Sequence, residues 1–283
     1  MTREKGRRTV RLGIVGTGLI GASLIEAAIA AGAVDEIVAY DTDAGHLAQV
    51  RARHAGIVPV SGPGDLEDCD LIFVCTPPDQ IASYVASYAS SNAIVVDVAS
   101  IKSGIVRDVR QQGGSPRFVP GHPLSGGTTT GPEEASADIV TRRPFVLTPY
   151  DGLDPEALAN ARTFIERLGA EVVLVDADAH DHVLALISHL PHLLSFAMID
   201  AFRSLPESDR ALAERLLPNS FLTVTQFAAS DPKMWSGIIA QNGGEIAGAG
   251  ERVFEALGSL LGGAAGDSEK RLAQLRAVRH DIG

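Results

Sequence analysis

Cysteine and positive charge are both scarce in this chain of 283 residues, and each shortage excludes a class of protein. The two cysteines, Cys69 and Cys75, lie in or beside one apolar run, which is typical of small side chains in a reduced cytoplasm and not of a disulfide framework. Lysine and arginine number 24 against 35 aspartates and glutamates, so the formal net charge is −11, and no basic run is present. We therefore expect no nucleic-acid partner.

Long uninterrupted apolar segments are also missing. The early apolar stretch over residues 14–34 contains Glu26 and several glycines, so a strand, a turn and a helix explain it better than a membrane span. We expect a cytoplasmic protein with no membrane contact. What the chain does contain is 45% hydrophobic and 21% charged residues, the usual balance of a globular protein with a sizeable core.

The pattern of apolar runs divides the chain into two parts. Short β-branched runs alternate with helical patterns in the first part, which predicts a mostly parallel sheet covered on both faces. The candidate strands are residues 11–16, 36–41, 56–60, 71–77, 93–100, 117–123, 144–149 and 171–176. After Asp176 only helical periods occur, and the candidate helices are 179–203, 207–216, 219–229, 232–242, 244–261 and 267–280. We predict an α/β domain over residues 1–177 and an all-α domain over 178–283.

A glycine-rich motif follows the first candidate strand. The stretch "GIVGTGLIG" places Gly16, Gly18 and Gly21 as G-x-G-x-x-G before a helix, the arrangement that receives a dinucleotide pyrophosphate in a Rossmann-type domain. Asp41 ends the second strand, where a carboxylate accepts hydrogen bonds from ribose and repels a 2′-phosphate. We predict NAD as the cofactor, although a glycine-rich turn without a nucleotide is the alternative. The other cofactor-binding residues that we predict are Leu19, Ile20, Thr76, Pro77 and Ser100.

Two polar residues follow later strands at the carboxyl edge of the predicted sheet, where open α/β sheets bind ligands. Ser100, in "DVASIKS", is a candidate catalytic residue, or else the N-cap of the next helix. His122, in "GHPLSG", is a candidate proton acceptor during hydride loss, or else a structural histidine.

The stretch "ISHLPHLLSF" puts two histidines and a proline inside a helical pattern. Three explanations compete: a helix break, a metal site and a substrate site. With Asp178 as N-cap and 100° per residue, Asp181, Ser188 and His192 share a narrow polar stripe, and Pro191 should kink the helix beside it. Ligands along one helix do not surround a metal, and no HExxH spacing exists, so we predict no metal. We expect His182 and His189 to be solvated or hydrogen-bonded.

These motifs, taken in order, resemble the prephenate/arogenate dehydrogenase family. The resemblance is carried over about residues 10–245 by "GTGLIGASL", "DVASIKS", "GHPLSG", "HDHVLALISHLPHLLSFAM" and "ASDPKMW". It implies an NAD-binding Rossmann domain, a helical domain that forms a homodimer, and oxidative decarboxylation of a small cyclohexadienyl acid in tyrosine biosynthesis. By the same resemblance His122 accepts the ring hydroxyl proton, Ser100 orients that hydroxyl, and His192 holds a side-chain carboxylate. Ser188, Ser125 and Gln226 complete the predicted substrate site.

The chain departs from the family pattern at the expected anion contacts. Gln226 stands where the family usually has an arginine, Leu222 stands where a basic residue is usual, and Gly127 and Thr128 replace a hydroxyl and acidic pair. A charged hydrogen bond contributes about 1.5–3 kcal/mol. Either another cation (Arg203, Arg215 or Lys233) supplies the charge, or the substrate is arogenate or another cyclohexadienyl acid such as an amino-substituted prephenate.

Two further hypotheses follow from other protein classes. A β-hydroxyacid dehydrogenase usually needs a lysine on the first long helix of its second domain, and residues 179–203 contain none. A nucleotide-binding protein without catalysis is supported only by the missing basic residues. For the dimer, we expect the apolar stripe Ile246, Val253, Leu257, Leu260 and Leu261 to contribute to the interface.

Overall fold

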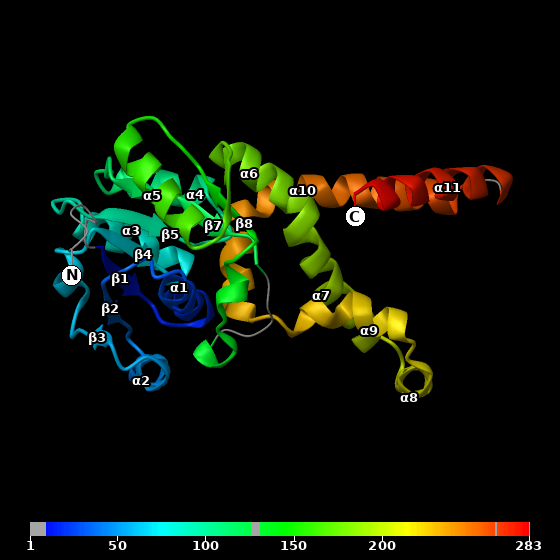
Figure 1. The fold of residues 1–283 in the computed structure, drawn as a ribbon. Helices are drawn as coiled ribbons and strands as arrows, with labels where there is room; N and C mark the ends of the chain where they lie inside the picture. The colour runs from blue at the N-terminus through cyan, green and yellow to red at the C-terminus, as the bar shows by residue number, and fades with distance from the viewer. Residues whose placement is uncertain (1–9, 126–130, 264, 283) are drawn as a thin grey trace.

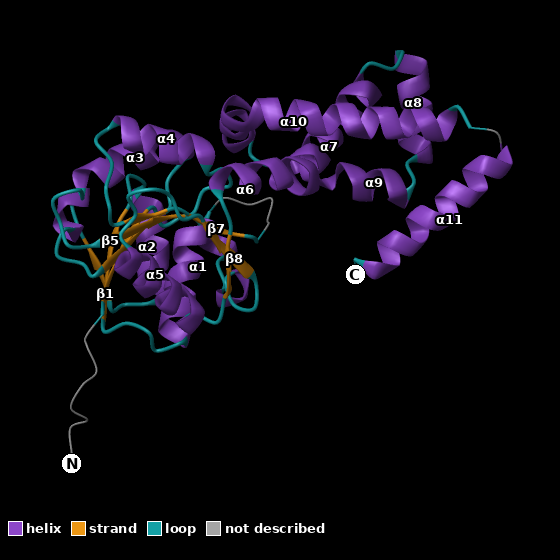
Figure 2. Ribbon diagram, turned by 90° about the horizontal axis from the view of Figure 1, so that it is seen from above, coloured by secondary structure: helices purple, strands orange, loops and turns teal. Residues whose placement is uncertain are grey.

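The computed structural model describes residues 10–125, 131–263 and 265–282. It consists of a sheet-containing part and a helical part that extends away from it, with the C-terminal helix at the far end (Figures 1 and 2). This arrangement agrees with the two parts predicted from the pattern of apolar runs.

The larger sheet has six parallel strands in the order β3-β2-β1-β4-β5-β6. Its central strands β1, β4 and β5 are almost entirely buried, which is why they are continuous apolar runs in the sequence. The prediction of a mostly parallel, two-sided sheet is confirmed. The strands of the chain are β1 (Arg11–Val15), β2 (Glu36–Tyr40), β3 (Ile57–Pro59), β4 (Leu71–Val74), β5 (Ile94–Asp97), β6 (Phe118–Val119), β7 (Gly121–Pro123), β8 (Pro144–Leu147) and β9 (Glu171–Leu174).

The predicted strand 117–123 is wrong as a single element, because it divides at Pro120. Phe118 and Val119 close the large sheet, whereas β7 belongs to a second sheet of order β7-β8-β9, in which β7 is antiparallel to β8. Proline has no N–H to donate to a ladder, and the Pro120 carbonyl accepts from Thr148 N of the second sheet. Because of this change of sheet, His122 lies in β7, where it faces α6 of the helical part.

Helices pack on both faces of the large sheet and form two apolar clusters. Phe73 of β4 contacts the rings of Phe145 and Phe164 in one cluster, and Tyr88, fully buried, belongs to the other. The second cluster also contains Trp235 and Ile246 of the helical part, so the two parts share a core. The helices here are α1 (Leu19–Ala30), α2 (Ala44–Arg53), α3 (Pro78–Ser87), α4 (Ser103–Gln111) and α5 (Pro155–Arg167), with 3-10 turns η1 (Pro63–Leu66), η2 (Pro132–Glu134) and η3 (Ala137–Ile139).

The helical part begins directly after β9. It comprises α6 (Ala177–Leu184), the π-turn η4 (Ala185–His189), α7 (Leu190–Arg203), α8 (Glu207–Leu216), α9 (Asn219–Thr225), the 3-10 turn η5 (Gln226–Ala229), α10 (Pro232–Leu261) and α11 (Ala265–Asp281). The N-cap of α6 is Asp176, whose side chain accepts from the N–H groups of Asp178 and Ala179, so the prediction of Asp178 as N-cap was wrong. The division of the domains at residue 177 stays a prediction.

The helix break predicted at Pro191 takes the form of a π-turn. Leu190 N donates to Ala185 O, an i→i−5 bond, and α7 then starts with Pro191 in its first turn, where its missing N–H is tolerated. An i→i−5 turn holds more residues than an α-turn, so the helical phase changes between Asp181 and His192. The prediction that Asp181, Ser188 and His192 share one polar stripe is therefore wrong. Asp181 faces α4, and His192 lies after the π-turn.

The predicted helices 232–242 and 244–261 form one long helix, α10. Asp231 caps it by accepting from Lys233 N. The predicted interruption is present as a local distortion, because Asn242 has non-helical angles (φ −121°, ψ 15°). Asn242 is buried, and its side chain bonds to the π-turn region described below.

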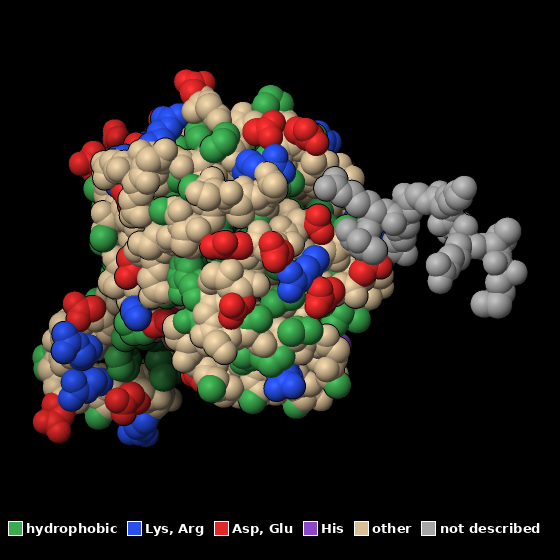
Figure 3. All heavy atoms as spheres, turned by 90° about the vertical axis from the view of Figure 1, so that its left-hand side faces the viewer, with side chains coloured by type: hydrophobic (Ala, Val, Ile, Leu, Met, Phe, Trp, Pro, Cys, Tyr) green, Lys and Arg blue, Asp and Glu red, His purple; other side chains and the backbone are tan. Residues whose placement is uncertain are grey.

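The surface charges and one long apolar helical stretch bear on the partners expected from the sequence. On the face in Figure 3, acidic and basic side chains are interspersed instead of gathering into one basic area. The continuous helical stretch Ala177–Arg203 is long and apolar enough to span a membrane by length and composition alone. However, its residues His180, Asp181 and His189 are buried and hydrogen-bonded within the chain.

Candidate functional site

The glycine-rich loop has the geometry that a bound pyrophosphate requires. Gly16 adopts φ +89°, and a Cβ built there would lie 2.6 Å from the Cys75 carbonyl oxygen. A Cβ at Gly21 would lie 1.9 Å from Gly16 O. No larger residue fits at either position, and Gly18 is the N-cap of α1 without a capping side chain.

Asp41 lies next to this loop, as its position at the end of β2 predicts. Its Oδ2 accepts from Thr17 N at 2.6 Å and from Thr17 Oγ1 at 2.8 Å, and its Oδ1 accepts from Asp43 N at 2.8 Å. The carboxylate thus fixes the loop while its remaining lone pairs can accept from a ribose.

The other predicted cofactor residues surround the same loop. Leu19 and Ile20 form the first turn of α1, whose N–H groups have no intrahelical acceptor. Thr76 and Pro77 follow β4, and Thr76 Oγ1 is buried with no hydrogen-bond partner among the described residues. The glycine cradle and this unpartnered hydroxyl fit a dinucleotide. A nicotinamide dinucleotide bound there supplies hydride acceptance.

Ser100 lies between β5 and α4 but does not cap the helix. The N-cap of α4 is Lys102, with no capping bond from its own side chain. Instead the carboxylate of Asp181 accepts from Lys102 N and from Ser103 N, each at 2.8 Å. The structure thus removes the capping role that competed with a ligand role for Ser100.

His122 is at the centre of a buried hydrogen-bonded chain. Its Nδ1 lies 2.9 Å from Nε2 of His180, and Nδ1 of His180 lies 2.7 Å from Oδ1 of Asp181. All three residues are less than 8% exposed. The chain connects β7 of the sheet part to α6 of the helical part and to the start of α4.

The electrostatic environment favours a neutral His122 and a charged Asp181. Burial, with further contributions from His180 and Lys102, holds the pKa of His122 well below its ordinary value. Burial acts to raise the pKa of Asp181, but hydrogen bonds from His180, Ser103 and Lys102 outweigh it and lower that pKa. His122 is therefore an uncharged imidazole, which can accept a proton.

A buried ion pair holds the strand that carries His122. Lys102 Nζ bonds to Asp97 Oδ2 and, at 2.5 Å, to Gly121 O, while Gly121 N donates to Asp97 Oδ1 at 2.9 Å. Both charged side chains are fully buried, and burial lowers the pKa of Lys102 against the opposing effect of Asp97. The pair joins the ends of β5 and β7.

His192 lies between two aromatic rings. Its ring centroid is 4.4 Å from those of Phe227 and Trp235, and Trp235 is buried. Because Nδ1 lies 2.9 Å from Ser188 O, a carbonyl, Nδ1 donates and Nε2 is the nitrogen that a ligand can reach. Ser188 thus orients His192 through its carbonyl.

The two positions at which the family usually contacts the substrate anion lie on α9 and η5, whereas His192 lies on α7. Gln226 is exposed at the start of η5, next to Phe227, and Leu222 is exposed on α9. Of the alternative cations, Arg203 is bonded to Asp200, whereas Arg215 and Lys233 are exposed. Ser125 follows β7 with a buried Oγ that has no partner among the described residues. Gly127 and Thr128 lie outside the residues that the structure describes.

The two histidines expected to be structural have protein partners. Nδ1 of His189 lies 3.1 Å from Asn242 Nδ2, and His182 bonds to Glu245 at the surface. Burial lowers the pKa of His189 to about 4, although Asp181 and the Ser100 backbone act in the opposite direction. Within the described residues, no group of three or more His, Cys, Asp or Glu side chains could hold a metal ion.

Four residues of this region were missed by the sequence analysis: His180, Phe227, Trp235 and Asn242. Phe227 and Trp235 flank His192, and Asn242 distorts α10 beside His189. His180 was the one with a usable signal, since it stands in "HDH" beside Asp181, which the sequence analysis had placed on a polar stripe. Its partner His122 is 58 residues earlier, so only the tertiary structure shows the pair.

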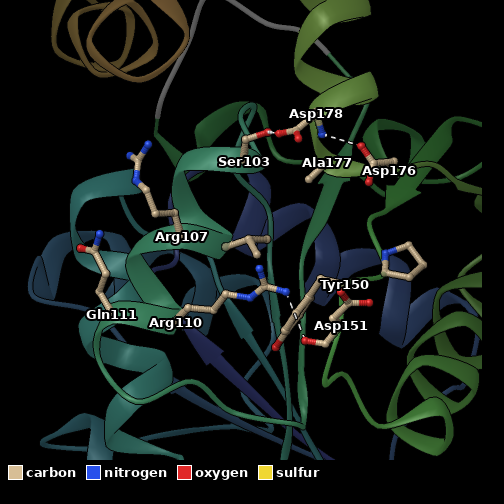
Figure 4. Close-up of a pocket in the computed structure, with 11 residues that line it drawn as sticks. Ser103, Arg107, Arg110, Gln111, Tyr150, Asp151, Asp176, Ala177 and Asp178 are labelled. Atoms are coloured by element: carbon tan, nitrogen blue, oxygen red, sulfur yellow. Dashed lines mark hydrogen bonds between the residues drawn. The ribbon is translucent and has the colours of Figure 1, made fainter.

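A pocket of about 560 Å³ lies on the outer side of the α4–α6 contact (Figure 4). Arg107 and Arg110 from one face of α4 line it together with Tyr150 and the start of α6. At its rim Ser103 Oγ donates to Asp178 Oδ1 at 2.6 Å, a second link between these helices. None of the predicted catalytic or substrate residues lines this pocket.

Comparison with known proteins places both parts of the chain in one family. Residues 28–174 match the family model described as "Prephenate dehydrogenase, nucleotide-binding domain", and residues 176–261 match "Prephenate dehydrogenase, dimerization domain". Two curated relatives are the cyclohexadienyl dehydrogenase of Zymomonas mobilis, 30% identical over 62% of this chain, and the probable prephenate dehydrogenase NovF of Streptomyces niveus, 33% identical over 69%. The matches span 61% and 54% of those relatives' lengths.

Solved structures agree with this match. The Synechocystis arogenate dehydrogenase is 27% identical with a TM-score of 0.81, over 97% of this chain and 100% of that one. The A. aeolicus prephenate dehydrogenase has a TM-score of 0.90 at 24% identity, over 99% and 100% of the two chains, which shows the shared fold. Because both family models match in order and cover most of the sequence, the chain belongs to the prephenate dehydrogenase family of oxidoreductases.

Proposed function

We propose that the chain catalyses the NAD-dependent oxidative decarboxylation of a cyclohexadienol, either prephenate to 4-hydroxyphenylpyruvate or arogenate to tyrosine. The observation that carries the proposal is the buried His122, whose Nδ1 is occupied by His180, so that Nε2 is left to accept a proton. It lies in β7 next to β5, after which Ser100 follows. Relatives named for prephenate, arogenate and cyclohexadienyl substrates support the reaction class.

The residues of this chain have three tasks in that reaction. Nε2 of His122 takes the proton of the ring hydroxyl, a general-base contribution of about 10²–10⁴-fold. Ser100 orients the same hydroxyl and the nicotinamide. The aromatic rings of Phe227 and Trp235 hold His192 in place, with Ser188 and Ser125 nearby. Because Nδ1 of His192 donates to Ser188 O, its Nε2 can donate to a substrate carboxylate when the ring is an imidazolium.

The substituent on the substrate ring is the open part of the proposal. Gln226 provides neutral amide donors and acceptors where the family usually has a guanidinium, and Leu222 provides none. This favours a substrate that carries a hydrogen-bond donor, such as the amino group of arogenate or of an amino-substituted prephenate, from which the amide oxygen of Gln226 can accept. A protein that binds NAD without catalysis is the remaining alternative.

The proposed cofactor is NAD and not NADP. Asp41 follows β2 and Asp43 comes two residues later, and carboxylates in this position of a Rossmann-type domain repel a 2′-phosphate; no arginine is adjacent to them in the sequence. The structure of the A. aeolicus relative is named as a complex with NAD⁺. We also propose a cytoplasmic homodimer that pairs through the helical domain, since that domain matches a dimerization model.

The test is a substrate panel with the purified chain. Prephenate, arogenate and an amino-substituted prephenate are each supplied with NAD or with NADP, and formation of the reduced cofactor is followed. We expect turnover with NAD for at least one acid. No turnover of any of them at millimolar concentration would exclude the proposed reaction, and tight NAD binding with no turnover would favour the non-catalytic alternative.

A further inference from the structure

We propose that His180 and Asp181 are positioning residues that set the tautomer of His122 and so make its Nε2 the proton acceptor. Both belong to α6 of the helical domain, whereas the base lies in the sheet domain. The inference rests on the proposed function for the role of His122. The hydrogen-bonded chain itself is an observation that stands without that role.

The hydrogen-bond directions in the series His122–His180–Asp181 follow from Asp181, its last member. Asp181 already accepts two backbone N–H groups at the start of α4 and is a carboxylate, which can only accept. Nδ1 of His180 must therefore donate to Asp181, at 2.7 Å. In a neutral imidazole this leaves Nε2 of His180 as an acceptor.

The same reasoning then reaches His122. With Nε2 of His180 accepting, Nδ1 of His122 must carry the hydrogen between them, at 2.9 Å. The neutral ring then has its lone pair on Nε2, the nitrogen that faces away from the chain. The opposite tautomer would place two lone pairs against each other at the His122–His180 contact.

Burial makes this choice of tautomer strict. His180 is 1% exposed, Asp181 4% and His122 7%, so water cannot replace a lost partner. An unpaired buried polar group costs about 1–3 kcal/mol. Lys102 closes the network, because its N–H donates to Asp181 while its Nζ holds Asp97 and the carbonyl of Gly121, the residue before His122.

The arrangement also accommodates the charge that develops in the reaction. When the ring hydroxyl gives up its proton, its O–H bond breaks and an N–H bond forms at Nε2 of His122, which becomes an imidazolium. No other proton needs to move. The positive ring donates through Nδ1 towards His180 and the Asp181 carboxylate, and the two N–H groups at the start of α4 hold that carboxylate in place.

The first experiment measures the tautomer directly. Imidazole nitrogen NMR on the ¹⁵N-histidine-labelled full chain distinguishes protonated from unprotonated ring nitrogens. We expect His122 to be protonated at Nδ1 and unprotonated at Nε2. The opposite assignment would overturn the proposal. This measurement needs no variant and no turnover, so it stays decisive even if the proposed reaction fails.

The second experiment uses His180→Phe. Phenylalanine occupies the place of the imidazole but accepts no hydrogen bond, so nothing holds the hydrogen on Nδ1 of His122 and the Nε2-protonated tautomer becomes accessible. We expect kcat to fall at least about tenfold while KM and the Kd for NAD change less than threefold. The NMR signals of His122 should then show a population that is protonated at Nε2.

Matched controls separate positioning from structural damage. Asp178→Asn alters another α6 carboxylate that bonds to the start of α4, and His182→Gln alters the neighbouring exposed histidine. Both should keep wild-type kcat. His180→Gln is the conservative rescue, because its amide can donate to Asp181 and accept from Nδ1 of His122, and it should keep the tautomer and most of kcat. If His180→Phe does not fold, His180→Leu serves in its place, with the same expected loss of kcat. A folded His180→Phe or His180→Leu with wild-type kcat, or with only KM changed, would refute the proposal.

Discussion

At the scale of single residues, one residue type serves different purposes here because its partners differ. Nδ1 of His122 is paired with an imidazole, Nδ1 of His189 with an amide, and Nδ1 of His192 with a carbonyl. These partners determine which nitrogen carries hydrogen and which is left for a ligand. The sequence shows only that histidines are present.

His122→Ala should abolish most of the catalysis without abolishing cofactor binding. We expect kcat to fall 10²–10⁴-fold, since the proton acceptor is lost, while the glycine-rich loop and Asp41 keep the Kd for NAD near its wild-type value. Steady-state kinetics and NAD titration measure the two effects. His182→Ala, at an exposed histidine, is the control, and near-full activity of His122→Ala would contradict the mechanism.

Gln226→Arg tests the substrate substituent. If the natural substrate is not prephenate, the added guanidinium should raise kcat/KM for prephenate about 10- to 150-fold, as expected for one charged hydrogen bond. The gain should appear in KM, because the carboxylate is bound equally in the ground and transition states. Gln112→Arg, an exposed position at the end of α4, controls for net charge. An unchanged KM for prephenate would exclude Gln226 as the position that contacts the carboxylate.

At the scale of elements, the helix from Ala177 to Arg203 is the one that joins the two domains. Its first segment caps α4 through Asp181, its π-turn presents His189 to the distorted position of α10, and its last segment carries His192. Asn242 Nδ2 donates both to Asp181 O and to Nδ1 of His189. The second bond requires a neutral His189, so this junction is sensitive to acid.

Acid should therefore weaken the fold through His189. Its pKa is about 4 in the native chain and about 6.5 when unfolded, so below pH 6.5 the unfolded chain takes up a proton that the native chain refuses. Stability is complete above that pH and is lost as the pH falls towards 4, by about 2 kcal/mol at about pH 5. His122, whose pKa is also lowered, acts in the same direction.

Denaturant unfolding at about pH 7.5 and about pH 5 measures this effect. His189→Gln should reduce the difference in free energy of unfolding between the two conditions by about 2 kcal/mol. His182→Gln, at an exposed histidine, should leave the difference unchanged. Equal pH dependence of His189→Gln and the wild type would show that His189 titrates normally.

At the scale of the whole molecule, the end of α10 and helix α11 extend away from the sheet-containing part (Figure 2). Both carry exposed apolar side chains. Phe254 is 60% exposed and Leu261 is 79% exposed, and Leu272 and Val278 of α11 are more than half exposed. Ile246 of the predicted interface stripe is wrong for that role, because it is buried in the core of its own chain. The others, Val253, Leu257, Leu260 and Leu261, are half-buried or exposed.

Leu257→Glu should therefore dissociate the proposed dimer. A charge placed in an apolar interface has no partner, so we expect the mass by light scattering at micromolar concentration to fall from that of two chains to that of one. Val58→Glu, at an exposed position on the edge strand β3, should keep the wild-type mass. A wild-type mass of one chain would refute the dimer.

The sequence by itself determined the order of the elements, the glycine cradle and the fold class. Strand periodicity and the spacing of Gly16 and Gly21 are local patterns, where the covalent chain restricts geometry, and Asp41 follows the next strand at the spacing that the motif predicts. The sequence also contains Pro120, but it does not show that the strand divides there. A strand changes sheets only when another strand can pair with it, and here β7 pairs with β8.

Only the tertiary structure decided what surrounds His122, the proposed base. His122 meets His180 across 58 residues, and Lys102 N meets Asp181 across 79. Hydrogen bonds of this kind depend on how the two domains pack. That packing depends on the π-turn Ala185–His189, which a sequence pattern with 3.6 residues per turn does not predict. The sequence contains the proposed base, His122, but the tautomer that we propose for it depends on a contact between the two domains.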